Sequence, residues 1–293
     1  MQEACDRFLL YQKANGNSPR TLIYYRDVIG GFLRFLMAHG HGTALSDLTV
    51  ATARQWQTAM RDRGLSQKTI QSWSVGLKVW AKWLHEEGLL DRNPLARLKR
   101  PRADDVAKDS LSPDEVKTLL AACDRDTTMG ARDYALLLLL YSTALRSTEA
   151  RQITRGDLNR RTGSLQVRRG KGGKVRTVPL TPAVAQAIDH YLTFHGAGEA
   201  LFLTRYGTPL TQEGFRQIFR RLEVATGIRC NPHKWRHSSA IQYLRNGGRV
   251  EVLQRLLGHS TLHMTLQYAR QVGADVLNGH KTADPVTALQ LTD

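Results

Sequence analysis

Several absences limit what this chain of 293 residues can be. It has three cysteines, Cys5, Cys123 and Cys230, an odd number whose spacing fits neither a disulfide framework nor a zinc site. Its longest apolar run, Ala135 to Leu140, is far shorter than a bilayer requires, so no membrane partner is expected. No signal peptide is visible, and a reducing cytoplasm is the expected compartment.

Acidic residues are also scarce relative to basic ones. The sequence holds 42 Lys and Arg against 26 Asp and Glu, which gives a net charge of +16. The excess is shared between residues 1–100, with 15 basic and 8 acidic residues, and the remainder, with 27 and 18. A charge of this size in both parts favours a polyanionic partner, and nucleic acid is the expected one. A basic surface that only confers solubility is the alternative.

Residues 1–95 are predicted to form a helical domain. Ser18 and Ser66 are N-caps, and each precedes apolar residues at helical spacing, over residues 22–36 and 70–84. The face opposite the second apolar stripe is basic, and a solvated surface is the alternative to DNA contacts there. The candidate phosphate contacts in this domain are Arg20, Lys68, Lys78 and Lys82.

A basic segment follows, and residues 96–110 are predicted to be a linker between domains. Asn93-Pro94 ends the helical unit, and the next residues include the run RLKRPR. A linker of this composition can lie along a phosphate backbone, so its basic side chains are candidate DNA contacts. They are Lys99, Arg100 and Arg102.

Residues 111–276 are predicted to form a second domain, mainly α with a small β-sheet, so the fold class is α+β. Ser112 to Glu115 form a capping box, and a buried helix is expected from Ala131 to Thr143. A hairpin is expected where apolar strand residues flank the turn at 170–173; these residues are Leu165, Val167, Val175 and Val178. Helices are predicted after Thr181-Pro182 and at about 211–223, 233–246, 250–257 and 261–270.

Polar residues gather at a few places in this otherwise apolar domain. They are Arg146 with Glu149, Lys171 on the hairpin turn, His233 with Arg236, Gly258-His259, and Tyr268 nine residues later. Each has a structural alternative when taken singly: a surface ion pair, a solvated turn, a helix cap or a core tyrosine. His233 and His237 also have an i,i+4 spacing that zinc sites use, but Lys234 and Arg236 between them oppose cation binding, so no metal is expected.

The order and spacing of these residues resemble the tyrosine recombinases, also called phage-type integrases. The segments SPRTLIYYRDVIGGFLRFL and LSQKTIQSWSVGLKVWAKWL resemble the core-binding domain of the Xer and integrase branch. The resemblance implies a SAM-like core-binding domain at 1–95 and a mixed α/β catalytic domain at 111–276. It assigns the catalytic residues Arg146, Lys171, His233, Arg236, His259 and the nucleophile Tyr268, with Glu149 accessory. Lys174 and Lys234 are further candidate DNA contacts.

These residues suit attack on a phosphodiester. Two guanidiniums, Arg146 and Arg236, can clamp the non-bridging oxygens, and a tyrosine that attacks phosphorus forms a covalent phosphotyrosine. Lys171 is the expected general acid, with Lys174 as the alternative; His233 is the candidate base, and His259 a hydrogen-bond donor to the phosphate. The covalent bond conserves energy, and no phosphate-binding loop ending in Lys-Ser or Lys-Thr is present, so no cofactor is expected.

The resemblance implies recombination by a homotetramer through a Holliday junction, with the tail at 277–293 exchanged between protomers. A type IB topoisomerase-like activity and a catalytically silent DNA-binding regulator are the alternatives. The sequence departs from the family pattern in three places. Ala144 stands where glycine is usual, Trp235 where leucine is usual, and the tail lacks the His-Pro-Arg stretch of Xer proteins, which favours a mobile-element recombinase.

Overall fold

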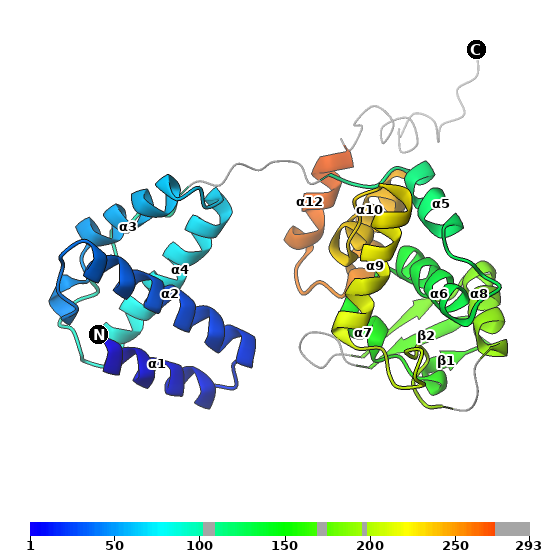
Figure 1. The fold of residues 1–293 in the computed structure, drawn as a ribbon, viewed down its shortest axis with the longest axis horizontal. Coiled ribbons are helices and arrows are strands. Elements are labelled where there is room, and N and C mark those ends of the chain that lie inside the picture. The colour runs from blue at the N-terminus through cyan, green and yellow to red at the C-terminus, as the bar shows by residue number, and fades with distance from the viewer. Residues whose placement is uncertain (102–108, 169–174, 195–197, 273–293) are drawn as a thin grey trace, which may run out of the picture. The chain divides into compact units, whose positions relative to one another are not determined.

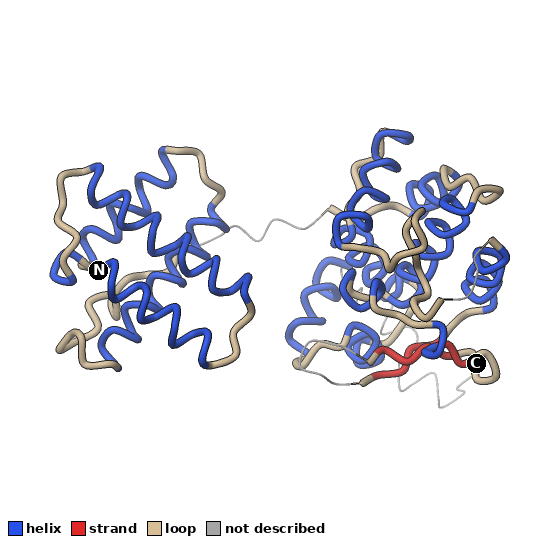
Figure 2. The backbone as a smooth tube through the Cα atoms, turned by 60° about the horizontal axis from the view of Figure 1, so that its bottom comes forward, coloured by secondary structure: helices blue, strands red, loops and turns tan. Residues whose placement is uncertain are grey.

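The computed structural model describes residues 1–101, 109–168, 175–194 and 198–272. The chain divides into two compact units, Met1–Val106 and Ala107–Asp293, each described here by itself (Figures 1 and 2). Four of the sequence predictions lie outside the described residues. They are the hairpin turn with Lys171, the DNA contacts Arg102 and Lys174, and the tail at 277–293.

The first unit is helical, as the sequence predicts. Its helices are α1 (Gln2–Ala14), α2 (Pro19–Ala38), α3 (Val50–Asp62) and α4 (Gln67–Glu86), with a short 3-10 helix at Leu45–Asp47. Ser18 and Ser66 cap α2 and α4 by accepting hydrogen bonds from the third residue of each helix, both at 3.2 Å. The apolar stripes meet in a core that includes Phe8, Phe32 and Trp80, none of them exposed.

The segment that follows α4 packs back onto this unit as far as Pro101. Leu95 and Leu98 are buried in its core. The Lys78 ammonium donates to the Leu98 carbonyl at 2.7 Å, and the Gln71 amide donates to the Pro101 carbonyl at 2.9 Å. The first residues of the predicted linker thus lie against α4, and the boundaries of the linker stay a prediction.

The second unit is mostly helical with a small antiparallel sheet, which confirms the predicted α+β class. Its helices are α5 (Pro113–Ala121), α6 (Thr128–Thr143), α7 (Ser147–Arg151), α8 (Pro182–Thr193), α9 (Gln212–Thr226), α10 (Pro232–Arg245), α11 (Val250–Leu257) and α12 (Leu262–Val272), with a 3-10 helix at Arg155–Asp157. Within the described ranges the sheet has the order β1 (Leu158–Asn159), β2 (Ser164–Val167) and β3 (Arg176–Pro179), and Figure 2 draws these strands in red. Leu165 pairs with Val178, as a hairpin requires, but Val175 lies just before β3 and is exposed.

Helix α6 is the centre of this unit. Leu136, Leu137 and Leu139 are not exposed at all, because α6 packs against both α8 and α10 (Figure 1). The apolar run of the sequence is therefore a core helix. Over the described ranges, no helix is long and apolar enough to cross a membrane.

Candidate active site

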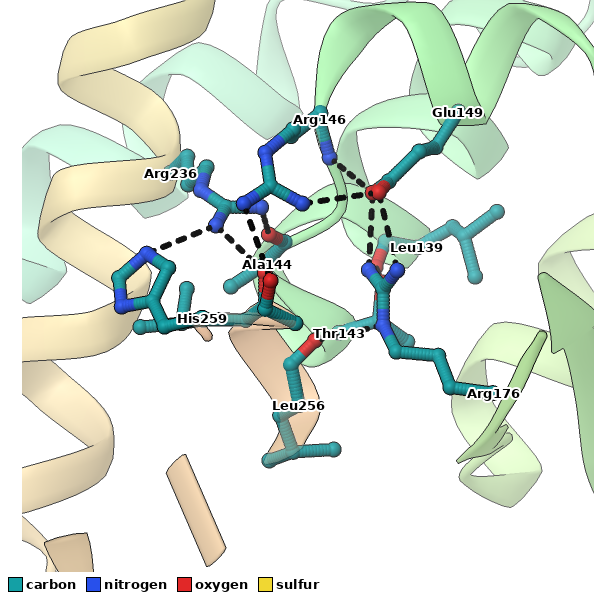
Figure 3. A network of polar contacts seen from close by, with 11 residues as sticks. Leu139, Thr143, Ala144, Arg146, Glu149, Arg176, Arg236, Leu256 and His259 are labelled. Atoms are coloured by element: carbon teal, nitrogen blue, oxygen red, sulfur yellow. Dashed lines mark hydrogen bonds and ion pairs between the residues drawn. The ribbon is translucent and has the colours of Figure 1, made fainter. Parts of the chain in front are cut away.

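Arg146 caps the start of α7, two residues after the left-handed Ala144 that ends α6. Its backbone N–H donates to Oε2 of Glu149 at 2.8 Å, and its Nη1 donates to Oε1 at 3.0 Å (Figure 3). The Glu149 side chain is only 1% exposed, whereas that of Arg146 is 25% exposed. The pair is therefore not the solvated surface pair that the i,i+3 spacing alone permits.

A second arginine holds the same carboxylate, and the sequence analysis did not identify it. Arg176, the first residue of β3, donates from Nη1 to Oε1 of Glu149 at 2.9 Å and from Nη2 to Oε2 at 2.8 Å. Its Nε donates to the carbonyl of Leu256 in α11 at 3.1 Å. The alternation of side chains along a strand could have identified it, because Arg176 lies two residues before the buried Val178 and therefore points to the same, inner face.

Glu149 is ionised in this setting. Burial by itself raises the pKa of the carboxyl, but the hydrogen bonds from Arg176 and from the Arg146 backbone, with the charges of both arginines, hold it below its ordinary value. The carboxylate therefore fixes Arg146 and Arg176 together.

Arg236 comes from α10 and is 8% exposed. Its guanidinium donates to the carbonyls of Ala144, at 2.5 Å, and Leu257, at 2.9 Å. Burial, followed by the charge of Arg146, lowers the pKa of Arg236 to about 10, so it remains a cation at neutral pH. The structure thus brings Arg146 and Arg236, which are 90 residues apart in the sequence, to the same place (Figure 3).

His259 is neutral at physiological pH. Burial, and then the charges of Arg236, Arg146 and Arg176, lower its pKa to about 4. Its Nε2 lies 3.4 Å from Nη2 of Arg236, which can only donate, so Nε2 accepts there. The proton is then on Nδ1, which is 3.0 Å from the Thr265 hydroxyl.

Tyr268 lies on α12 beside these residues. Its ring is nearly parallel to that of His259, with centroids 6.3 Å apart, and lies 5.2 Å from the ring of His237. The ring also packs against a small apolar cluster that contains Ala144 and Leu257. Sequence reasoning considered His237 only as a metal ligand, whereas the structure buries it against the tyrosine.

His233 and Lys234 open α10 beside a polar pocket of about 260 Å³. His233 is exposed, and the Lys234 ammonium donates to Asp109 at 2.6 Å. His237 lines this pocket and also contacts Tyr268, so the pocket adjoins the tyrosine. Three guanidiniums and one carboxylate thus gather near a partly buried phenol, which leaves an excess of positive charge that can bind an anion.

Comparison with known proteins shows the family of the chain. Residues 109–273 match the model of the phage integrase family. The tyrosine recombinase XerC of Rhodospirillum centenum is 34% identical over 296 residues, which cover 97% of this chain and 86% of that protein. The chain belongs to the phage integrase family.

Two solved integrase structures share the fold. The Tn1549 transposon integrase in complex with circular intermediate DNA has a TM-score of 0.73 at 24% identity, and the match covers 90% of this chain and 94% of that one. A lambda integrase dimer bound to a core site has a TM-score of 0.75 at 21% identity, with 92% and 76% covered.

The structure accounts for both departures of this integrase from the family pattern near the arginines. Ala144, in the place of the usual glycine, ends α6 with φ of 49°, a left-handed conformation that alanine adopts at a cost. Trp235, in the place of leucine, is fully buried, and its Nε1 donates to the carbonyl of Leu137 at 3.0 Å. The extra polar atom of the indole is thus satisfied, and neither substitution removes a group from the arginine cluster.

The predicted DNA contacts of the helical unit differ in their environments. Arg20, Lys68 and Lys99 are exposed, and Lys82 forms an exposed i,i+4 pair with Glu86 at 3.1 Å. Lys78 and Arg100 are engaged within the unit: Lys78 donates to the Leu98 carbonyl, and Arg100 donates to the Gln71 side chain at 3.1 Å. For this integrase Arg20, Lys68 and Lys99, which are exposed and form none of these contacts, are therefore the stronger candidates for DNA contacts.

Proposed function

We propose that the protein is a site-specific DNA recombinase that cleaves and rejoins DNA through a 3′-phosphotyrosyl intermediate on Tyr268. One observation carries the proposal. In a member of the integrase family, Arg146, Arg236 and His259 converge beside a tyrosine ring. A phosphodiester at this place receives charge-assisted hydrogen bonds on its non-bridging oxygens, where negative charge increases during attack.

The proposed cleavage step conserves the number of phosphodiester bonds. The Tyr268 oxygen attacks phosphorus and loses its proton to His233, while the bond from phosphorus to the 5′-oxygen breaks. Lys171, assigned from the sequence, protonates the departing 5′-oxygen. Attack by the 5′-hydroxyl of another strand reverses these transfers and completes strand exchange, so the reaction consumes no ATP and uses no metal in this proposal.

His259 has a specific part in this scheme. The three arginines that lower its pKa are the groups that a bound phosphate neutralises. Phosphate binding therefore raises the pKa of His259 and favours an imidazole that donates from Nε2 to a phosphate oxygen.

The proposed partners are double-stranded DNA with a specific site, found in the nucleoid of the cytoplasm, and further copies of the same chain. Four protomers are proposed to hold two DNA sites through a Holliday junction, with the tail at 277–293 exchanged between neighbours. Integration, excision and resolution of a mobile element all fit this chemistry. The alternative of relaxation by a topoisomerase-like enzyme shares the cleavage step but needs no pairing of sites.

The test uses a duplex selected by the protein from a random-sequence pool and then nicked near the cleavage point. Wild-type protein is expected to form a protein–DNA adduct that survives denaturant. Tyr268→Phe should lose the adduct and keep its DNA affinity, whereas Tyr243→Phe, in the same apolar cluster, should keep both. An adduct on the Tyr268→Phe protein refutes the assignment. Relaxation of plasmids that lack the site favours a topoisomerase, and tight binding without any adduct favours the silent regulator.

A further inference from the structure

The Glu149 carboxylate is saturated by two arginines. A carboxylate has about four lone-pair positions. Oε1 accepts from the Nη1 atoms of Arg146 and Arg176, and Oε2 accepts from the Arg146 backbone and from Nη2 of Arg176. Arg176 thus supplies two of the four hydrogen bonds, and its side chain is 15% exposed.

Removal of Arg176 would change the electrostatics of Arg146. The group of Arg146, Glu149 and Arg176 carries a net charge of +1, and without Arg176 it is neutral. Water cannot easily take the place of the lost donors, because the Glu149 side chain is 1% exposed. The unsatisfied carboxylate then attracts the remaining guanidinium, and Arg146 loses both its excess charge and its place in front of a phosphate.

We propose that Arg176 is a positioning residue for DNA cleavage: by balancing the charge of Glu149, it leaves Arg146 free to bind the scissile phosphate. The inference rests on the proposed function, in which Arg146 is a phosphate clamp. Arg176 does not itself contact the reacting atoms, and it acts through the carboxylate that it shares.

The surroundings of Arg176 connect it to other parts of the site. Its Nε donates to the Leu256 carbonyl, two residues before Gly258. A Cβ at Gly258 would lie 3.1 Å from Nη1 of Arg176 and 3.4 Å from Nη1 of Arg146, so a side chain there would push on both guanidiniums. The Arg176 side chain therefore extends from β3 and packs closely against the segment Leu256–Gly258 that precedes His259.

The same unit contains a similar arrangement elsewhere, which provides a control. Asp133 is held by Arg132 at 2.6 Å and by Arg221 at 2.7 Å, and Arg132 also donates to the Leu203 carbonyl at 2.8 Å. Arg132 is 2% exposed and takes no part in the site described above. Arg132→Met therefore removes a buried arginine from a carboxylate without changing the environment of Arg146.

The experiment measures single-turnover adduct formation on the nicked duplex, beside DNA affinity by gel shift and thermal unfolding. Arg176→Met should slow cleavage by about 10- to 100-fold, less than the ~10²–10³ lost with a direct oxyanion donor, with DNA affinity within about threefold of wild type. Arg132→Met should lower thermal stability and leave the cleavage rate of the folded protein unchanged.

The decisive variant is the double substitution Glu149→Gln with Arg176→Met. A neutral amide does not hold Arg146 by charge and restores the net charge of +1, so the double variant should cleave at least about tenfold faster than Arg176→Met alone, since coupled neighbours are non-additive. If Arg176 has only a structural role, the free-energy costs to cleavage of the single substitutions Glu149→Gln and Arg176→Met should add in the double variant. A double variant no faster than Arg176→Met, or an Arg176→Met protein as fast as wild type, overturns the inference.

Two further results remain interpretable. If the Arg176→Met protein does not fold, Arg176→Gln takes its place, because a glutamine amide can still donate a hydrogen bond to the carboxylate. It is then compared with the double variant that also carries Glu149→Gln. If wild-type protein itself forms no adduct, the proposed function has failed rather than the role of Arg176.

Discussion

Ala144 stores backbone strain at the arginine cluster, and its replacement by glycine measures that strain. Ala144 has φ of 49° and ψ of 33°, and among the described residues it is the one non-glycine residue with positive φ. A left-handed conformation costs alanine about 1–2 kcal/mol. The carbonyl of Ala144 accepts the hydrogen bond from Arg236, so the strained residue supports a proposed phosphate clamp directly.

Ala144→Gly should leave the free energy of unfolding almost unchanged. Relief of the strain stabilises the folded chain, but the buried methyl group contributes about 0.8 kcal/mol and the freer unfolded glycine chain costs about 0.4–1 kcal/mol. These contributions nearly cancel. The matched control is Ala240, a residue of the same apolar cluster inside α10 and fully buried. Ala240→Gly loses the same methyl group without relieving any strain, and glycine is about 1 kcal/mol less favourable than alanine in a helix interior.

Ala240→Gly should therefore be less stable than Ala144→Gly by at least about 1 kcal/mol. Urea unfolding of the full chain, monitored through hydrogen exchange of the α6 amides, reports on the stability of the second unit alone. Equal losses of stability in the two variants would refute strain at Ala144. Cleavage by Ala144→Gly should stay close to the wild-type rate, because the carbonyl that holds Arg236 is retained.

Two further predictions concern pH and assembly. The pKa of His259 falls from 6.5 to about 4 on folding, so between these pH values the unfolded chain takes up a proton that the folded chain does not, and stability falls as pH falls through this window. His259→Gln should flatten the dependence of the free energy of unfolding on pH, measured by urea unfolding between pH 6.5 and 4. An unchanged dependence contradicts the assignment. The pKa of Glu149 is lowered from 4.5 on folding, so its contribution to stability is lost as pH falls below about 4.5, which overlaps only the lower end of this window and serves as the internal reference. Deletion of residues 277–293 should spare binding to one site and weaken pairing of two sites and recombination, measured by gel shift and strand exchange; full-rate recombination by the truncated chain would refute a role for the tail.

Much of the fold could be predicted because its signals are local. Ser112 forms the expected capping box with Glu115: the Glu115 backbone donates to the serine at 3.1 Å, and the Ser112 backbone donates to the carboxylate at 2.7 Å. Caps and apolar periodicity act within a few residues, so one sequence is enough to reveal them. The short elements α7 and β1 escaped prediction because five and two residues are too few to show a period.

The partners within the site were harder to predict, for the same physical reason. The contact of Arg176 with Glu149 joins residues 27 positions apart, and that of Arg236 with Ala144 joins residues 92 apart. Local pattern can indicate that Arg176 points inward, but the identity of its acceptor depends on how α7 and β3 pack. The family resemblance supplied the candidate residues, whereas the charge balance around Glu149 needed the structure.

Helix ends explain how three arginines can lie close together in this unit. The last carbonyls of a helix lack intrahelical partners and lie at the negative end of its dipole. Arg236 donates to the carbonyl that follows α6 and to the last carbonyl of α11, Arg176 donates to the Leu256 carbonyl of α11, and Arg146 donates to the Gly258 carbonyl at 3.3 Å. Each guanidinium has five N–H groups, so these bonds hold the cations against their mutual repulsion and still leave donors available. The packing of α6 and α11 therefore brings the three arginines together, and the proposed function assigns the remaining donors of Arg146 and Arg236 to the scissile phosphate.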